Sequence, residues 1–189
     1  MRLVSGPRTP SGTVIGTLRQ RAALAAPVAC SVAVVERLKY DDQTAFTLAD
    51  DAATIARIIR TTAADRLRAV KFGDWTALEV IGHVTDTAEV FAGRVRKMIA
   101  EDTPRLAPMD QDTVHAQNKN NERDPMDLSK RLQAAHGEIV RLLMERANRE
   151  RLGIHGEWGE VDAAHVAGYQ ARHAHEHVTE IAAKFPPAN

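Results

Sequence analysis

Four long segments with apolar residues at helical spacing limit what this chain can fold into. They span roughly Leu48–Val70, Thr76–Ala100, Leu128–Asn148 and Val161–Lys184. In each segment apolar residues recur every three or four positions, which is the period of a helix with one buried face. Aromatic residues make up only 4% of the chain, and strands prefer aromatic and β-branched residues. The sequence therefore predicts an all-α protein.

Local signals indicate where the helices begin and end. Thr76 and Glu79 have the spacing of a capping box, in which each side chain bonds the backbone N–H of the other residue. Asp127 is the expected cap of the third helix, and Pro186 should stop the fourth.

Connection lengths predict the topology. The first connection is short, so the first two helices are expected to be antiparallel neighbours. Residues 101–126 form a long connection with three prolines, long enough to cross the whole bundle. The second and third helices would then run parallel. The expected fold is a four-helix bundle with up-down-down-up topology and a long crossover between helices 2 and 3.

The first 45 residues differ from the rest, so we expect a flexible leader at 1–45 and the bundle domain at 46–185. Residues 1–35 contain four arginines and no acid. The apolar stretch 22–35 is interrupted by Pro27 and is shorter than the roughly 20 residues that span a bilayer. A misplaced start codon or an export signal, with Cys30 as a lipid acceptor, are the alternatives.

Charge and cysteine content narrow the function classes. Lys plus Arg and Asp plus Glu number 25 each, so the basic excess typical of a nucleic-acid binder is missing from the sequence. Cys30 is the sole cysteine, which rules out an internal disulfide and a cysteine-based zinc cluster. We expect a cytoplasmic protein that binds neither nucleic acid nor membrane. A homodimer is compatible with the sequence.

Histidines provide the strongest functional signal. His173 and His177 are four residues apart, so on a helix they differ by about 40° and point the same way, whereas His175 faces elsewhere. His83 lies about 9 Å from the start of the second helix and His177 about 10 Å from the end of the fourth. If those helices are antiparallel, His83 and His177 lie at the same height along the bundle axis. We therefore expect a metal site formed by His83, His173 and His177.

Other metal and nucleotide motifs are missing from the sequence. It contains no Glu-x-x-His pair of the kind used by di-iron carboxylate bundles and no His-Glu-x-x-His. Neither a phosphate-binding glycine loop nor a Gly-x-Ser-x-Gly nucleophile turn occurs.

Several short segments resemble the DinB/YfiT-like family. The strongest are Trp75–Asp86 and His173–His177, with Met109–Asp112 and His155–Gly159 between them. The resemblance covers roughly residues 48–184. It implies an up-down-down-up four-helix bundle whose metal is held by one histidine early in the second helix and two on the last helix. In this sequence those positions are His83, His173 and His177.

The resemblance implies a metal-dependent hydrolase or a transferase that uses a low-molecular-weight thiol, acting on a small molecule. Three neutral imidazoles leave a divalent ion with an open position for water or a thiol. Zinc fits best, and nickel, iron or manganese could occupy the same ligands. Asp86 and Glu180 are candidate catalytic residues that could orient an imidazole or relay a proton; otherwise both are exposed helix-face acids. The alternatives are a non-catalytic, stress-related binding or scaffold bundle with a vestigial metal site, and a lipid-anchored envelope protein.

Overall fold

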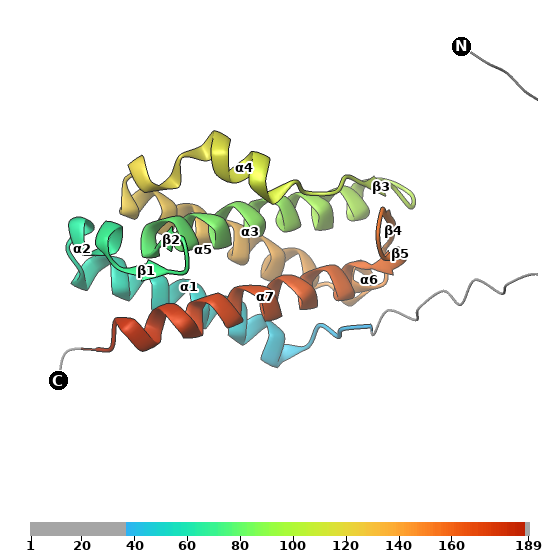
Figure 1. The fold of residues 1–189 in the computed structure, drawn as a ribbon. Coiled ribbons are helices and arrows are strands. Elements are labelled where there is room, and N and C mark those ends of the chain that lie inside the picture. The colour runs from blue at the N-terminus through green and yellow to red at the C-terminus, as the bar shows by residue number, and fades with distance from the viewer. Residues whose placement is uncertain (1–36, 188–189) are drawn as a thin grey trace, which may run out of the picture. The chain divides into compact units, whose positions relative to one another are not determined.

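The computed structural model describes residues 37–187, and each of the four predicted segments contains a long helix (Figure 1). These helices are α1 (Asp42–Thr61), α3 (Ala77–Ala100), α5 (Pro125–Leu143) and α7 (Ala163–Lys184). The proposed leader residues 1–36, including Cys30, lie outside the described part of the chain. Shorter helical pieces are α2 (Ala64–Ala69), α4 (Gln111–Asn118), α6 (Arg146–Arg149) and the 3-10 turn Asn120–Glu122.

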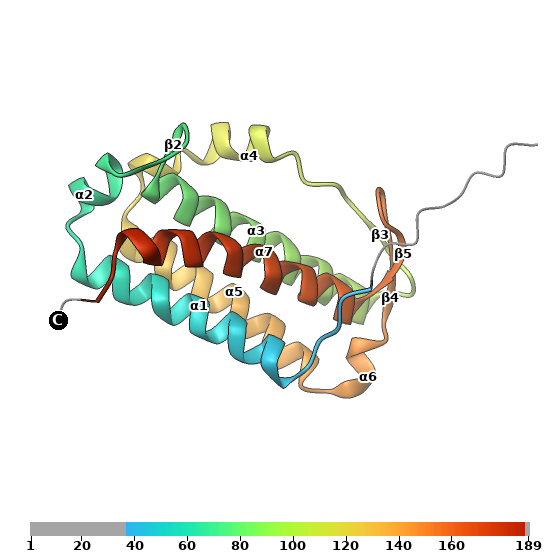
Figure 2. The same cartoon turned by 60° about the horizontal axis from the view of Figure 1, so that its bottom comes forward.

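The predicted topology is confirmed. In Figures 1 and 2, α3 and α5 run in one direction and α1 and α7 in the other, which is the up-down-down-up order. Each of α1 and α3 packs mainly against α5 and α7. The expectation that the first two helices are neighbours is therefore wrong, because α1 and α3 occupy opposite corners. Residues 62–76, which include α2 and the hairpin β1 (Lys71–Phe72) and β2 (Trp75–Thr76), span that diagonal.

Two helix boundaries differ from the prediction, and one predicted cap is present. The first segment is broken after Thr61, where the extended backbone of Thr62 separates α1 from α2. The third helix is capped by Asp124, whose side chain accepts from the N–H of Met126, and Pro125 takes the first helical position, where no N–H is needed. Asp127 therefore lies inside the first turn. The predicted capping box of Thr76 and Glu79 is present at the start of α3.

Two features lie between the helices where the sequence analysis expected only loops. The crossover contains β3 (Arg105–Leu106), α4 and the 3-10 turn, and residues 152–162 form the hairpin β4 (Leu152–His155) and β5 (Gly159–Asp162). Strand β3 pairs in parallel with β4, which is also antiparallel to β5. This small sheet fastens one end of the crossover to the connection that leads into α7.

Residues 37–45, assigned to the leader by the sequence analysis, pack on the bundle. Tyr40 is buried in the core, with the Arg149 guanidinium 5.2 Å from its ring centroid. The backbone N–H of Leu38 donates to Nδ1 of His165 at 3.0 Å. Asp41 caps α1, which begins six residues before the expected Leu48. The ordered bundle thus includes these residues, and a dispensable leader remains a prediction for residues 1–36.

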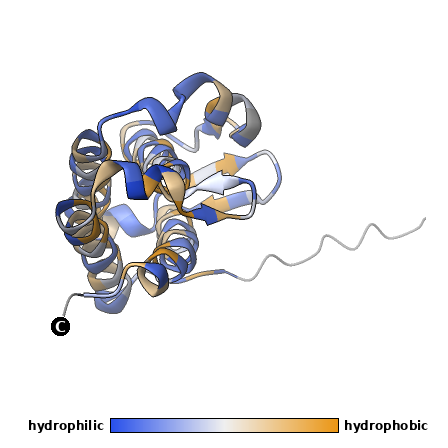
Figure 3. Cartoon of the chain, turned by 60° about the vertical axis from the view of Figure 1, so that its left-hand side comes forward, coloured by the Kyte–Doolittle hydropathy of each residue, from blue (hydrophilic) through white to orange (hydrophobic). Residues whose placement is uncertain are grey.

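The core lies between the four long helices. Its fully buried side chains are almost all leucine, isoleucine, valine and alanine from α1, α3, α5 and α7. Figure 3 shows the corresponding stripes, in which apolar and polar residues alternate along each helix. Within residues 37–187, no helix has the length and apolar character needed to cross a bilayer.

Candidate metal centre

The three predicted histidines come together between α3 and α7. Nε2 of His83 and Nε2 of His173 are 3.0 Å apart. One ring nitrogen from each of His83, His173 and His177 lies within 4.8 Å of those of the other two. His83 sits in the second turn of α3 and the other two on consecutive turns of α7, and these helices pack antiparallel. The sequence analysis expected His83 and His177 to lie at the same height along the bundle, and the structure places them side by side.

Two of the three imidazoles, His83 and His173, are held in the neutral form that a metal needs. His83 is only 6% exposed, and burial together with the charges of His173 and His177 lowers its pKa to about 4. Burial also lowers the pKa of His173, with His177 adding to the effect. Neutral imidazole has a free nitrogen lone pair, so at neutral pH at least these two rings can act as ligands.

Trp75 connects the His83 ring to the crossover. The Trp75 ring packs edge-to-face against the His83 ring with centroids 5.3 Å apart. Trp75 is stacked in turn on His115 of α4 at 4.3 Å, and Nε2 of His115 lies 3.9 Å from a carboxylate oxygen of Glu79. The crossover thus reaches the metal centre through His115 and Trp75.

Asp86 is placed differently from what its spacing to His83 suggested. It is 4% exposed, and its two oxygens accept hydrogen bonds from Asn120 Nδ2 at 2.7 Å and Arg131 Nη2 at 3.1 Å. These partners lie on the crossover and on α5. Within the described residues no imidazole bonds to Asp86, which instead ties the crossover and α5 to α3.

Glu180 and His175 lie on the outer surface of α7. The Glu180 side chain is exposed and makes no hydrogen bond to an imidazole among residues 37–187. His175, which was expected to face away from the site, has a side chain that is 57% exposed and lies 2.9 Å from the buried Asp51 carboxylate of α1. It is therefore a natural control residue for the three candidate ligands.

A small cavity of about 80 Å³ opens beside the histidines. Its walls come from α3, α7, the crossover and the β4–β5 turn, and His173 forms part of the wall. Tyr169 lies one turn before His173, with their rings stacked at 6.2 Å, and Trp158 lies 4.6 Å from Tyr169. Both aromatic residues also line the cavity.

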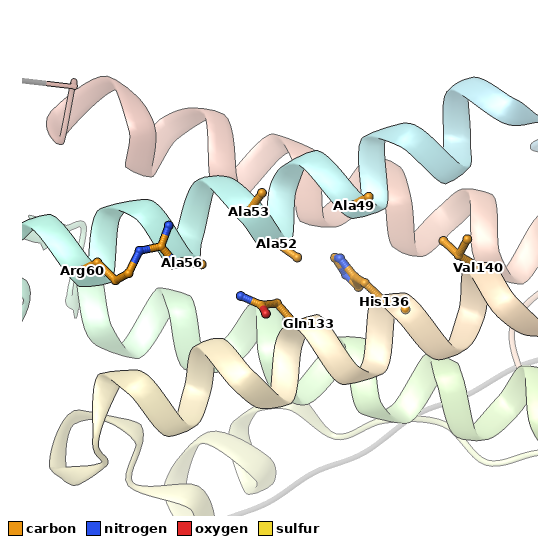
Figure 4. A pocket seen from close by; sticks show the side chains of 9 residues that line it. Ala49, Ala52, Ala53, Ala56, Arg60, Gln133, His136 and Val140 are labelled. Atoms are coloured by element: carbon orange, nitrogen blue, oxygen red, sulfur yellow. The ribbon is translucent and has the colours of Figure 1, made fainter.

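A larger cavity of about 400 Å³ lies elsewhere, between α1 and α5. Figure 4 shows its lining, which includes four alanines of α1, with Gln133 and His136 reaching in from α5. His136 is buried, its Nδ1 lies 2.8 Å from the Leu48 carbonyl oxygen, and its Nε2 lies 3.3 Å from the Gln170 amide. These contacts occupy both ring nitrogens, so this cavity offers little chemistry despite its size.

The fold and the site together define a class of protein. Its members are up-down-down-up four-helix bundles in which three imidazoles converge between the second and fourth long helices. Residues 47–181 match the model of the DinB superfamily, and the chain belongs to this family. The family resemblance noted from the sequence is thereby confirmed.

Two solved structures show the same fold. YfiT from Bacillus subtilis, described as a probable metal-dependent hydrolase with an unusual four-helix bundle topology, superposes with a TM-score of 0.66 at 21% identity, covering 78% of this chain and 88% of YfiT. A mycothiol-dependent maleylpyruvate isomerase superposes with a TM-score of 0.58 at 12% identity, covering 74% of this chain and 59% of the isomerase. The chain thus matches less than two thirds of the isomerase. A search of curated proteins returned no match.

Proposed function

We propose that this protein is a metal-dependent enzyme that acts on a small molecule, as a hydrolase or as a transferase of a low-molecular-weight thiol. The observation that carries the proposal is the convergence of three imidazole nitrogens, with one of the three rings, His173, in the wall of a cavity. The descriptions of the two structural neighbours, a probable metal-dependent hydrolase and a mycothiol-dependent isomerase, support a hydrolytic reaction and the use of a small thiol, respectively.

The residues fit a divalent ion. His83, His173 and His177 would hold it, and their nitrogens are close enough for one ion to reach all three after small side-chain adjustments. Since the three ligands are neutral, an ion would keep its full charge and act as a strong Lewis acid toward a water or thiol. Zinc is the proposed metal, and nickel, iron and manganese suit the same ligands.

The chain itself supplies orientation. Trp75 packs against the His83 ring, and Tyr169 stacks on His173. The cavity wall combines aromatic side chains, such as Phe91 and Trp158, with charged ones, Arg94 and Glu157. Neither Asp86 nor Glu180 is placed against an imidazole, so a role for either in proton transfer would require a path through solvent or substrate.

Metal analysis tests the site directly. The purified protein should contain one divalent ion per chain, and His83→Ala, His173→Ala and His177→Ala should each lose most of it. His175→Ala is the matched control and should retain the metal, since His175 is on the outer face of α7. Circular dichroism of each variant confirms that the bundle is folded. Equal metal content in all five proteins would contradict the proposal.

An activity screen separates the reaction classes. A thiol transferase should consume an electrophile only when a small thiol is added, whereas a hydrolase should turn over esters or amides without one. A non-catalytic binding or scaffold bundle would do neither. If the metal-loaded protein gives no turnover with either panel, and thiols leave the spectrum of its cobalt form unchanged, the enzyme proposal fails.

A further inference from the structure

Arg94 stands out among the residues that line the cavity beside the histidines. It is only 7% exposed, although arginine is rarely buried without a charged partner. Its Nη2 donates to the Ala107 carbonyl at 2.7 Å. Its Nε is fully buried and has no hydrogen-bond partner among the described residues. Nη1 also has no hydrogen-bond partner among the described residues, so the terminal nitrogens, rather than the buried Nε, are the atoms that a ligand in the cavity could reach.

The position of Arg94 on α3 directs it toward the metal centre. Arg94 follows His83 by eleven residues, which is three helical turns plus about 20°, so both lie on one helix face. Their Cα atoms are about 16 Å apart at the α-helical rise. Helical side chains lean toward the N-terminus, and the Arg94 guanidinium lies 4.7 Å from the ring centroid of Phe91, one turn closer to His83.

The charges around Arg94 belong to the same cavity. Glu157 and Tyr169 act electrostatically on Arg94, and Arg94 in turn helps to lower the pKa of His155, after burial. All three of these residues line the cavity with His173. Glu157 is exposed at the β4–β5 turn and forms no ion pair with Arg94 within the described chain. The cavity therefore contains a fixed positive charge without a direct protein counter-ion.

We infer that Arg94 binds a carboxylate of the substrate, so that the cavity selects a small molecule with an anionic end at Arg94 and its reacting group at the histidines. This inference rests on the proposed function and names its substrate class. A planar carboxylate matches the fork formed by the two terminal nitrogens of arginine. A phosphate dianion suits the site less well, because one arginine would face two negative charges with Glu157 nearby.

Thiols of matched length test the inference on the cobalt-loaded protein. The probes are a series of ω-mercaptoalkanoates and the corresponding ω-mercaptoalkanamides, whose binding is followed by the cobalt absorption spectrum. For the chain length that spans the two groups, the carboxylate should bind about 10- to 100-fold more tightly than the amide, as expected for a charge-assisted hydrogen bond. Equal affinity of carboxylate and amide at every length would overturn the inference.

Variants assign the preference to Arg94. Arg94→Gln should abolish it, and Arg94→Lys should retain only part, because lysine keeps the charge but loses the fork. Arg96→Gln is the matched control, since Arg96 is exposed and pairs with Glu138 on the surface. Glu157→Gln should strengthen carboxylate binding by up to about fivefold, because it removes a nearby like charge. If Arg94→Gln does not fold, Arg94→Lys and the wild-type comparison carry the test.

A measurement on metal-free protein separates this inference from the proposed function. The 15N–1H resonance of Arg94 Nε should shift with hexanoate and stay unchanged with hexanamide. A shift combined with a cobalt spectrum that no thiol perturbs would refute the thiol-transferase form of the proposed function and leave the carboxylate site standing. No shift with hexanoate, combined with equal binding of both thiol series, would refute the carboxylate site and leave the metal centre standing.

Discussion

Replacement of Asp86 by alanine tests whether this residue acts on the metal centre or on the fold. The side chain is buried and accepts hydrogen bonds from Asn120 of the crossover and Arg131 of α5. Removing it leaves the Asn120 amide without an acceptor in the interior and takes away one of the two acceptors of Arg131 Nη2. The structure therefore predicts a loss of stability, with the metal content of the folded protein unchanged.

The size of the loss follows from the bonds removed. Hydrogen bonds to a charged group contribute about 1.5–3 kcal/mol each, and buried donors left without a partner cost a similar amount. Arg131 keeps its two bonds to Glu89 at 2.9 and 2.7 Å, so its charge remains paired. We expect Asp86→Ala to lower the free energy of unfolding by about 2–4 kcal/mol, or the melting temperature by roughly 4–16 °C.

Urea unfolding followed by circular dichroism measures this change, with metal analysis of the same samples. Glu89→Ala is the matched control, because it removes the more exposed partner of Arg131 and should cost less than about 1 kcal/mol. A stability loss below 1 kcal/mol for Asp86→Ala, together with weaker metal binding or a shifted pH profile of activity, would refute the structural role and favour the relay role suggested by the sequence.

Three further predictions concern the bundle. Gly82→Ala should lower the free energy of unfolding by about 1–3 kcal/mol in urea unfolding, because the new methyl group would overlap the buried Asn120 and displace its hydrogen bond to Asp86. An unchanged urea midpoint would show that the crossover can move away from α3 at little energetic cost. Burial lowers the pKa of His136 to about 4. The unfolded chain therefore takes up the proton first, and His136 alone should lower the free energy of unfolding by about 3 kcal/mol as pH falls from about 6.5 to 4. In urea unfolding of metal-free protein across this range, His136→Gln should reduce the loss, and the remainder should include the contribution of His83, whose pKa burial also lowers to about 4. A chain that starts at residue 37 should have the melting temperature of the full-length protein. A chain that starts at residue 46 should have a melting temperature roughly 6–12 °C lower, since it lacks buried Tyr40 and the Asp41 cap. Equal melting temperatures of the two shortened chains would support a dispensable leader that extends to residue 45.

The fold was largely predictable because its four long helices carry periodic apolar faces. Chain length between them determined the direction of each helix, but not which helices are neighbours. The short strands could not be predicted from the sequence, because two-residue and four-residue strands have too little periodicity to detect. The break after Thr61 was missed for a similar reason, since the apolar pattern continues through α2 to Leu67.

The metal-site residues were predictable because the position of each histidine along its own helix can be calculated from the sequence. Spacing placed His173 and His177 together, and helix levels brought His83 to them. Asp86 was misjudged because spacing from His83 says nothing about partners on the crossover and α5. Arg94 was overlooked, although its eleven-residue spacing from His83 puts it on the same helix face; its burial and unpaired Nε become visible only after the crossover and the hairpin are in place.

The small sheet at the end of the bundle has a consequence for reshaping the cavity. Arg105 of the crossover pairs with Ile154 of the hairpin, so two walls of the cavity depend on one sheet, while the histidines and Arg94 are on helices. A change in the length of the turn at residues 156–158 should therefore alter the shape of the cavity and leave the helical scaffold intact. Directed evolution of substrate preference would do best with libraries that vary this turn, because most substitutions in the helices would also disturb the core.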